Sequence, residues 1–153
     1  MANILIIGAG SMGTAFSFPC FDNGHSVTII GTHLENNFID QINLKRMHPT
    51  LKCEVPKNVK FLKFDKLVEE INKKVDLIAV AVISKGIEWA SIELSKILKS
   101  NIPILILTKG LAINNNNYEV LAHKMERLLK KNGIKETNIS VAGGPCLAKG
   151  LAN

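Results

Sequence analysis

Long apolar runs and aromatic side chains are scarce in this chain. No apolar run approaches the roughly 20 residues that a membrane-spanning helix needs, and the first residues lack the basic start and cleavage site of a signal peptide. Aromatic residues make up 5% of the 153 residues, and no basic block interleaves with them, so the net charge of +6 does not favour nucleic-acid binding. We therefore expect a cytoplasmic domain with neither a membrane nor a nucleic acid as partner.

Paired cysteines and clustered metal ligands are also missing. The three cysteines, Cys20, Cys53 and Cys146, are odd in number and match no zinc or disulfide spacing. The four histidines form no cluster typical of a metal site. Free thiols suit a reducing compartment such as the cytoplasm. The sequence thus predicts neither a bound metal nor a disulfide framework.

The most informative stretch is residues 4–13, where an apolar run ends in Gly-x-Gly-x-x-Gly and a helical pattern follows. Gly8 allows the tight turn, Gly10 leaves room for a pyrophosphate near the backbone, and Gly13 lets the helix pack closely on the strand. The free N–H groups at the start of that helix face the phosphates. In this order of strand, turn and helix, the motif predicts dinucleotide binding.

In such a fold, the end of the second strand, here residues 26–30, contacts the adenosine ribose of the dinucleotide. An acidic residue there binds the 2′-hydroxyl of NAD, whereas a small, polar or basic residue tolerates the 2′-phosphate of NADP. Gly31-Thr32-His33 follows this strand, and Glu35 comes later than that role requires. Thr32 and His33 can donate to a phosphate, or Thr32 can cap the next helix. We therefore expect no carboxylate at the end of this strand, which argues against strict selection of NAD and leaves the choice between NAD and NADP open.

Strand-like and helix-like patterns alternate along the chain. Predicted strands cover residues 3–8, 26–30, 59–62, 75–82, 103–107 and 138–142. Predicted helices cover residues 12–21, 34–46, 84–98 and 118–131, with a further one capped by Asp65, while residues 47–56 and 114–117 are predicted loops. Pro19 is expected to end or kink the first helix, and Ser84 is expected to cap the helix over residues 84–98. This alternation predicts a single α/β domain with a doubly wound parallel sheet (Rossmann fold) of about six strands.

Ligands of an open parallel sheet lie beyond the carboxyl ends of its strands. Lys109 directly follows an apolar strand, so we expect its ammonium to point into the cleft, where a compact cation suits phosphate; a solvated loop lysine is the alternative. Residues 143–146 form a second glycine turn, whose N–H groups can receive an anion. Cys146 there is either a reactive thiol or, as we favour, a small inert side chain.

These segments together resemble the soluble NAD(P)-dependent glycerol-3-phosphate dehydrogenases. The resemblance rests on residues 8–15 (GAGSMGTA), 23–25 (NGH), 108–111 (TKGL) and 144–149 (GPCLAK), which occur in the family's order. Residues 31–34 (GTHL) with His48-Pro49 look like the archaeal-type branch. The similarity spans the whole chain and is much more specific than the glycine motif alone.

The family interconverts sn-glycerol 3-phosphate and dihydroxyacetone phosphate by hydride transfer with a nicotinamide. The resemblance and the glycine motif together imply NAD or NADP as cofactor, with these candidate contacts: Gly8, Gly10, Ser11, Met12, Gly13, Thr32, His33, Lys109 and Ala148. For the phosphorylated substrate the resemblance implies Lys109, Gly144 and Cys146.

The chain departs from the family in places. Cys146 stands where Ser, Thr or Ala is usual, Gly150 where Glu is usual, and Ile83 where Pro is usual. The family chain is much longer, with a helical second domain that carries the general acid/base lysine and the residues gripping the phosphate, whereas this sequence stops at Asn153. We expect residues 1–153 to be the cofactor domain, without a catalytic residue and inactive alone, from a family whose full-length members are homodimers.

Two other functions remain open. The chain can be the cofactor domain of a related reductase, such as a ketopantoate reductase, a hydroxyacyl dehydrogenase or a 2-hydroxyacid-type enzyme, although Lys109 and Gly144-Pro145 argue against this. It can also be a stand-alone dinucleotide sensor or regulatory module.

Overall fold

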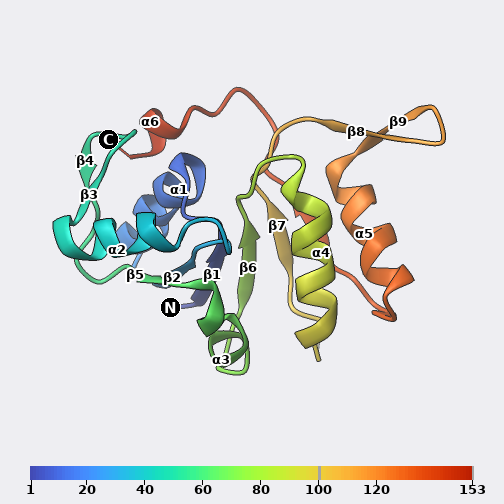
Figure 1. The fold of residues 1–153 in the computed structure, drawn as a ribbon, viewed down its shortest axis with the longest axis horizontal. Coiled ribbons are helices and arrows are strands. Elements are labelled where there is room, and N and C mark those ends of the chain that lie inside the picture. Colours follow the sequence, from blue (N-terminus) through green and yellow to red (C-terminus); the bar gives the residue numbers. More distant parts are fainter. Residues whose placement is uncertain (100, 153) are drawn as a thin grey trace.

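The computed structural model describes residues 1–99 and 101–152, and a parallel sheet of six strands forms its centre (Figure 1). The strands are β1 (Asn3–Ile7), β2 (Ser26–Ile30), β5 (Lys60–Leu62), β6 (Leu77–Val80), β7 (Ile104–Ile106) and β10 (Ile139–Val141). Their order is β10-β7-β6-β1-β2-β5, with every neighbouring pair parallel. The chain winds outward from β1 in both directions, so the predicted Rossmann fold is confirmed.

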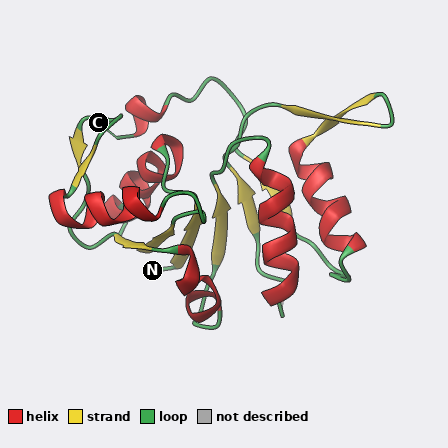
Figure 2. Cartoon of the chain, viewed as in Figure 1, coloured by secondary structure: helices red, strands yellow, loops and turns green. Residues whose placement is uncertain are grey.

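Both faces of this sheet are buried, as β1 shows residue by residue. Ile4 and Ile6 pack on one face with side chains of α1 (Ser11–Asp22) and α2 (Asn36–Lys45). Leu5 and Ile7 pack on the other face with side chains of α3 (Leu67–Ile71), α4 (Gly86–Ile97) and α5 (Leu121–Lys131). Successive strand residues point to opposite faces, so a strand covered on both sides is apolar throughout. Figure 2 shows the helices distributed around the strands in this way.

Several predicted boundaries were wrong. The first helix runs to Asp22, so Pro19 lies inside it and does not end it; the Asn23 backbone N–H and side-chain amide donate to the Pro19 carbonyl at 3.2 Å and 2.8 Å. Ser84 and Asp65 do not cap helices through their side chains. The Ser84 carbonyl instead accepts from Ile87 in the turn that leads into α4, and Asp65 lies in a 3-10 helix (Phe64–Lys66).

Two hairpins replace segments predicted as loop or helix. β3 (Met47–His48) pairs with β4 (Cys53–Glu54), and β8 (Leu111–Asn114) pairs with β9 (Asn117–Val120). Residues 118–120 were predicted as the start of a helix and are instead strand. Asn115 and Asn116 both have positive φ, 48° and 60°, which is the backbone of a two-residue hairpin turn. Figure 1 shows this second hairpin projecting away from the sheet above α5.

The last described element is α6 (Ala148–Leu151), which packs beside α1. The segment after β10 crosses the top of the molecule in Figure 1 to reach it. Among the helices described, none combines the length and the apolar character needed to cross a membrane.

Candidate functional site

The β1–α1 turn has the three geometries that its glycines were predicted to provide. Gly8 has φ +105°, and a Cβ there would lie 2.7 Å from the Ala81 carbonyl oxygen. A Cβ on Gly13 would lie 2.1 Å from the Gly8 carbonyl oxygen, so only glycine permits this close approach. A Cβ on Gly10 would meet only a Glu35 carboxylate oxygen, at 4.0 Å. Gly8 and Gly13 are therefore required by packing, whereas Gly10 leaves open space.

A first cavity of about 450 Å³ lies between this turn, the end of β2 and the start of α4. The structure brings four of the predicted cofactor residues together around it: Gly8, Gly10, Thr32 and His33. Trp89, which no sequence motif indicated, lines the same cavity from the first turn of α4. The His33 and Phe64 rings each lie 5.1 Å from the Trp89 ring between centroids. These contacts make one wall of the cavity aromatic.

Glu35 corrects the prediction that no carboxylate sits at the end of β2. Its Oε2 accepts hydrogen bonds from the Thr32 N–H at 2.7 Å and the Ala9 N–H at 3.2 Å. The carboxylate reaches the strand end because the Glu35 N–H bonds back to the Thr32 carbonyl at 2.9 Å, which folds residues 32–35 into a turn. Thr32 is accordingly not a helix cap, and α2 begins at Asn36 rather than at Leu34.

A second cavity, of about 380 Å³, lies on the other side of Gly10. Four predicted residues line it: Gly10, Ser11, Met12 and Lys109. The Lys109 ammonium donates to the Ala142 carbonyl at 2.6 Å, and the buried Thr108 hydroxyl donates to the Val82 carbonyl at 2.6 Å. These bonds fasten the end of β7 to the segments that follow β10 and β6. Lys109 is exposed and borders the cavity, where its charge can reach a bound anion.

Four predicted residues line neither cavity: Gly13 is buried against the Gly8 carbonyl, and the other three lie in or near the turn after β10. Gly144 and Cys146 are exposed, Ala148 is half-buried at the start of α6, and none of the three lines either cavity among the described residues. Gly144 has φ +97°, so it does provide a left-handed turn. The assignment of these three residues to cofactor and substrate stays a prediction, as does that of the residues that line the cavities.

Beneath the glycine turn lies a histidine that the sequence analysis did not single out for a role of its own. His48 on β3 is 1% exposed, its Nδ1 accepts the Leu51 N–H at 3.1 Å, and Phe38 packs on its ring. Burial lowers the pKa of His48, against smaller opposing effects of the Ala9 backbone and Glu35. Its Nε2 is buried and has no hydrogen-bond partner within the part of the chain that the structure describes. His48 is therefore a packing residue under the turn, and its burial favours the neutral imidazole.

In the part of the chain that the structure describes, neither the thiols nor the acidic side chains form a metal site. Burial raises the pKa of the Cys20 thiol to about 11, which makes it inert. Within residues 1–99 and 101–152, no three His, Cys, Asp or Glu side chains converge as metal ligands would.

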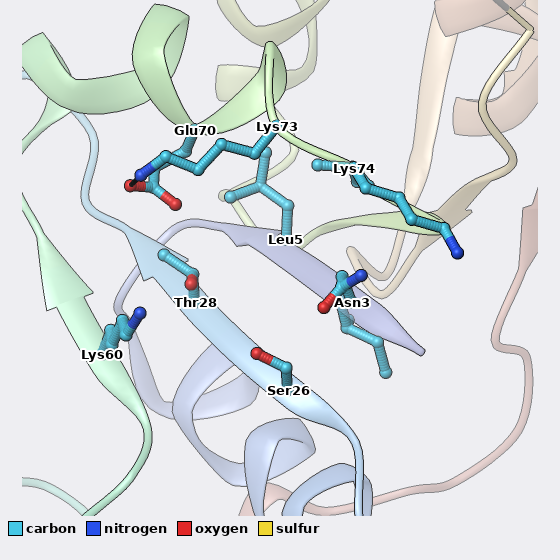
Figure 3. A pocket seen from close by; sticks show the side chains of 10 residues that line it. Asn3, Leu5, Ser26, Thr28, Lys60, Glu70, Lys73 and Lys74 are labelled. Atoms are coloured by element: carbon cyan, nitrogen blue, oxygen red, sulfur yellow. Dashed lines mark hydrogen bonds and ion pairs between the residues drawn. The ribbon is translucent and has the colours of Figure 1, made fainter. Parts of the chain in front are cut away.

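A further pocket, of about 170 Å³, lies at the amino ends of the strands and is drawn in Figure 3. Its most conspicuous cation, Lys73, is paired with Glu70 at 2.6 Å and Glu69 at 3.3 Å. Because ligands of parallel sheets bind at the carboxyl ends, the two cavities beside Gly10 are the candidate site.

The sequence model described as the N-terminus of NAD-dependent glycerol-3-phosphate dehydrogenase matches residues 3–153. The chain belongs to this family. The sequence-based predictions of the family and of NAD or NADP as the cofactor are thereby confirmed.

Curated relatives agree with this family. The NADP(+)-dependent glycerol-3-phosphate dehydrogenase of Archaeoglobus fulgidus is 27% identical over 149 residues, which are 97% of this chain and 43% of that protein. A glycerol-3-phosphate dehydrogenase of Halalkalibacterium halodurans, named for NAD(P)+, is 30% identical over 152 residues, or 97% of this chain and 41% of that protein. The chain spans less than half the length of these relatives.

Solved structures agree on the fold. The crystal structure of glycerol-3-phosphate dehydrogenase from Coxiella burnetii matches 99% of this chain and 43% of its own chain, with a TM-score of 0.79 and 22% identity. The Plasmodium falciparum glycerol-3-phosphate dehydrogenase structure has the same TM-score, 0.79, at 21% identity, and covers the same two shares.

Proposed function

We propose that residues 1–153 form one dinucleotide-binding domain, which holds NAD or NADP across the carboxyl ends of β1, β2 and β6. The observation that carries the proposal is the position of Gly10, which lines both cavities. NAD and NADP consist of two nucleotides joined by a pyrophosphate. The aromatic first cavity suits the adenosine, the second suits the nicotinamide, and the pyrophosphate then crosses over Gly10.

The start of α1 supports a pyrophosphate at this place. The cap position is Gly10, which has no side chain to accept the first N–H groups of the helix, and the first turn of α1 carries no acidic residue. A helix start without a side-chain cap and without an acidic residue in its own first turn offers its N–H groups and its positive dipole end to an anion. Ser11 and Met12 supply these N–H groups in the proposed complex.

Replacing Gly10 tests this arrangement, because the space above it is open to ligand and not to protein. A methyl group in Gly10→Ala meets no protein atom closer than 4.0 Å, so the melting temperature should stay close to that of the wild type. The methyl occupies the path of the pyrophosphate, and the affinity for NADH and NADPH in calorimetric titration should fall about tenfold or more. Gly143→Ala, where an added Cβ also meets nothing within 4 Å, is the matched control. Wild-type affinity in Gly10→Ala would overturn the proposal.

For the reaction, we propose hydride transfer between the cofactor and glycerol 3-phosphate or dihydroxyacetone phosphate at the second cavity. A bound nicotinamide supplies or accepts the hydride. Within this chain, Lys109 attracts the substrate phosphate, and Gly144 and Cys146 flank it. Titration of the dinucleotide-saturated domain with glycerol 3-phosphate tests this substrate, and equal heats for wild type and Lys109→Met would contradict the role of Lys109.

We further propose that these residues alone turn over little or no substrate. Lys109 is the only lysine lining the second cavity among described residues, and its ammonium is bonded to the Ala142 carbonyl. A general acid/base for the proton, such as the one expected in a helical second domain, therefore has to come from elsewhere. Steady-state oxidation of NADH or NADPH with dihydroxyacetone phosphate by residues 1–153 would refute this.

The surroundings of the domain complete the proposal. We propose that it acts in the cytoplasm without nucleic acid or membrane partners, and that full-length members of its family are homodimers. Light scattering of a full-length family member tests the dimer, and salt-sensitive binding of residues 1–153 to DNA would contradict the absence of a nucleic-acid partner.

A further inference from the structure

Glu35 fastens the glycine turn to the end of the neighbouring strand. One carboxylate oxygen, Oε2, accepts both the Ala9 N–H at 3.2 Å and the Thr32 N–H at 2.7 Å. Ala9 lies just after β1, and Thr32 lies just after β2, its parallel neighbour. The half-buried carboxylate is therefore held in place from two strands, and its position does not depend on a ligand.

The other carboxylate oxygen faces the candidate site. Oε1 lies 4.0 Å from the position of a Cβ on Gly10, and it makes none of the hydrogen bonds found among the described residues. Glu35, Gly10 and Thr32 line the same first cavity. A carboxylate oxygen can accept hydrogen bonds from two hydroxyl groups but can donate none. Oε1 is thus a fixed anionic acceptor beside the proposed path of the dinucleotide.

Lys85 and His33 line the same cavity, and neither forms an ion pair with Glu35 among the described residues. Lys85 is exposed, and the His33 ring packs against Trp89 with 5.1 Å between centroids. Neither comes within 4 Å of the Cβ position on Gly10, where the Glu35 oxygen is the one contact. The charge nearest to the turn is therefore negative.

We propose that Glu35 selects the cofactor, by accepting hydrogen bonds from the adenosine ribose hydroxyls of NAD(H) and repelling the 2′-phosphate of NADP(H). The proposal rests on the proposed function, since it assigns a selectivity to the same site. A phosphate placed against a fixed carboxylate suffers like-charge repulsion, whereas a hydroxyl gains a charge-assisted hydrogen bond. The preference for NAD that the sequence left open is thereby assigned to a residue outside the expected position.

Calorimetric titration of the 153-residue protein with NADH and with NADPH tests the proposal. In low salt we expect the affinity for NADH to exceed that for NADPH by about tenfold or more. In high salt this ratio should be smaller, because salt screens the repulsion. Glu35→Gln keeps an oxygen that can accept the Ala9 and Thr32 N–H groups and removes the charge. In this variant we expect the affinity for NADPH to rise about tenfold, and the affinity for NADH to change less than about threefold. Glu54→Gln, at an exposed carboxylate outside the cavity, should leave both affinities unchanged.

The outcomes separate the two proposals. If wild-type protein binds neither dinucleotide, the proposed function fails and this inference fails with it. If it binds both equally, or if Glu35→Gln keeps the wild-type ratio, dinucleotide binding stands and the role of Glu35 is refuted. Titration of wild-type protein with adenosine 5′-monophosphate and adenosine 2′,5′-bisphosphate gives the same discrimination without a variant. Equal affinity for these two nucleotides would also overturn the proposal.

Discussion

The border of the candidate site has two halves that differ in packing: the first lies at the ends of β1 and β2, and the second is the segment after β10. At the ends of β1 and β2, added Cβ atoms on Gly8, Gly13 and Gly31 would lie within 2.8 Å of another protein atom. After β10, added Cβ atoms on Gly143 and Gly144 would meet nothing within 4 Å. The first half owes its shape to contacts within this chain. The second half presents open surface, so its geometry depends more on what binds there.

The largest difference between the two halves is expected when one methyl group is added to each. In Gly13→Ala the new Cβ falls 2.1 Å from the Gly8 carbonyl oxygen, so helix α1 has to move off the turn. Overpacking of this kind costs about 1–3 kcal/mol or more, and dinucleotide binding should be lost with it. Gly143→Ala should change the free energy of unfolding by less than about 0.5 kcal/mol. Urea denaturation measures both, and similar losses would contradict the contrast.

The same contrast explains what the sequence could predict. The roles of Gly8 and Gly13 are set by a strand, a turn and a helix that are contiguous in the chain, so the motif alone predicts their geometry. Glu35 contacts Ala9, 26 residues earlier, through a turn on a different strand. That contact is tertiary, so the sequence alone does not show it. The position of Glu35 in the sequence, three residues after Thr32, wrongly predicted that its carboxylate does not reach the end of β2.

The hairpin at residues 111–120 shows a different kind of miss. A helix was predicted from Tyr118, because the apolar positions of α5 extend the helical pattern backward into β9. Asn115 and Asn116 adopt positive φ, and asparagine tolerates this backbone better than most residues. The asparagine pair was thus a hairpin signal that was interpreted as a loop.

A smaller effect on the free energy of unfolding is expected from His48, which lies beneath the first half. Burial lowers the pKa of His48, so between its folded and unfolded pKa values the unfolded chain binds more protons. The effect of His48 is therefore to lower the free energy of unfolding as the pH falls below its unfolded-state pKa of about 6.5. This loss is at most about 1.4 kcal/mol per pH unit. Urea denaturation between pH 7.5 and pH 5 measures this slope.

Variants separate His48 from the other titrating groups. His48→Asn keeps an acceptor for the Leu51 N–H and does not titrate in this range, so the part of the slope due to His48 should disappear even if the packing loosens. His123→Gln, at an exposed histidine on α5, should keep the wild-type slope. An unchanged slope in His48→Asn would mean that other groups cause the pH dependence.

The smallest effect on stability is expected where the two halves meet, at adjacent residues after β7. Thr108 is buried and donates to the Val82 carbonyl at 2.6 Å, so Thr108→Val should cost about 1 kcal/mol. Lys109 makes an equally short bond to the Ala142 carbonyl but is exposed, and water can replace that bond, so Lys109→Met should cost less than about 0.5 kcal/mol. If Lys109 serves the ligand, its variant should melt like the wild type and yet lose affinity for glycerol 3-phosphate. A loss of stability as large as that of Thr108→Val would instead make Lys109 a structural link between β7 and β10, because the bond would then be needed without any ligand.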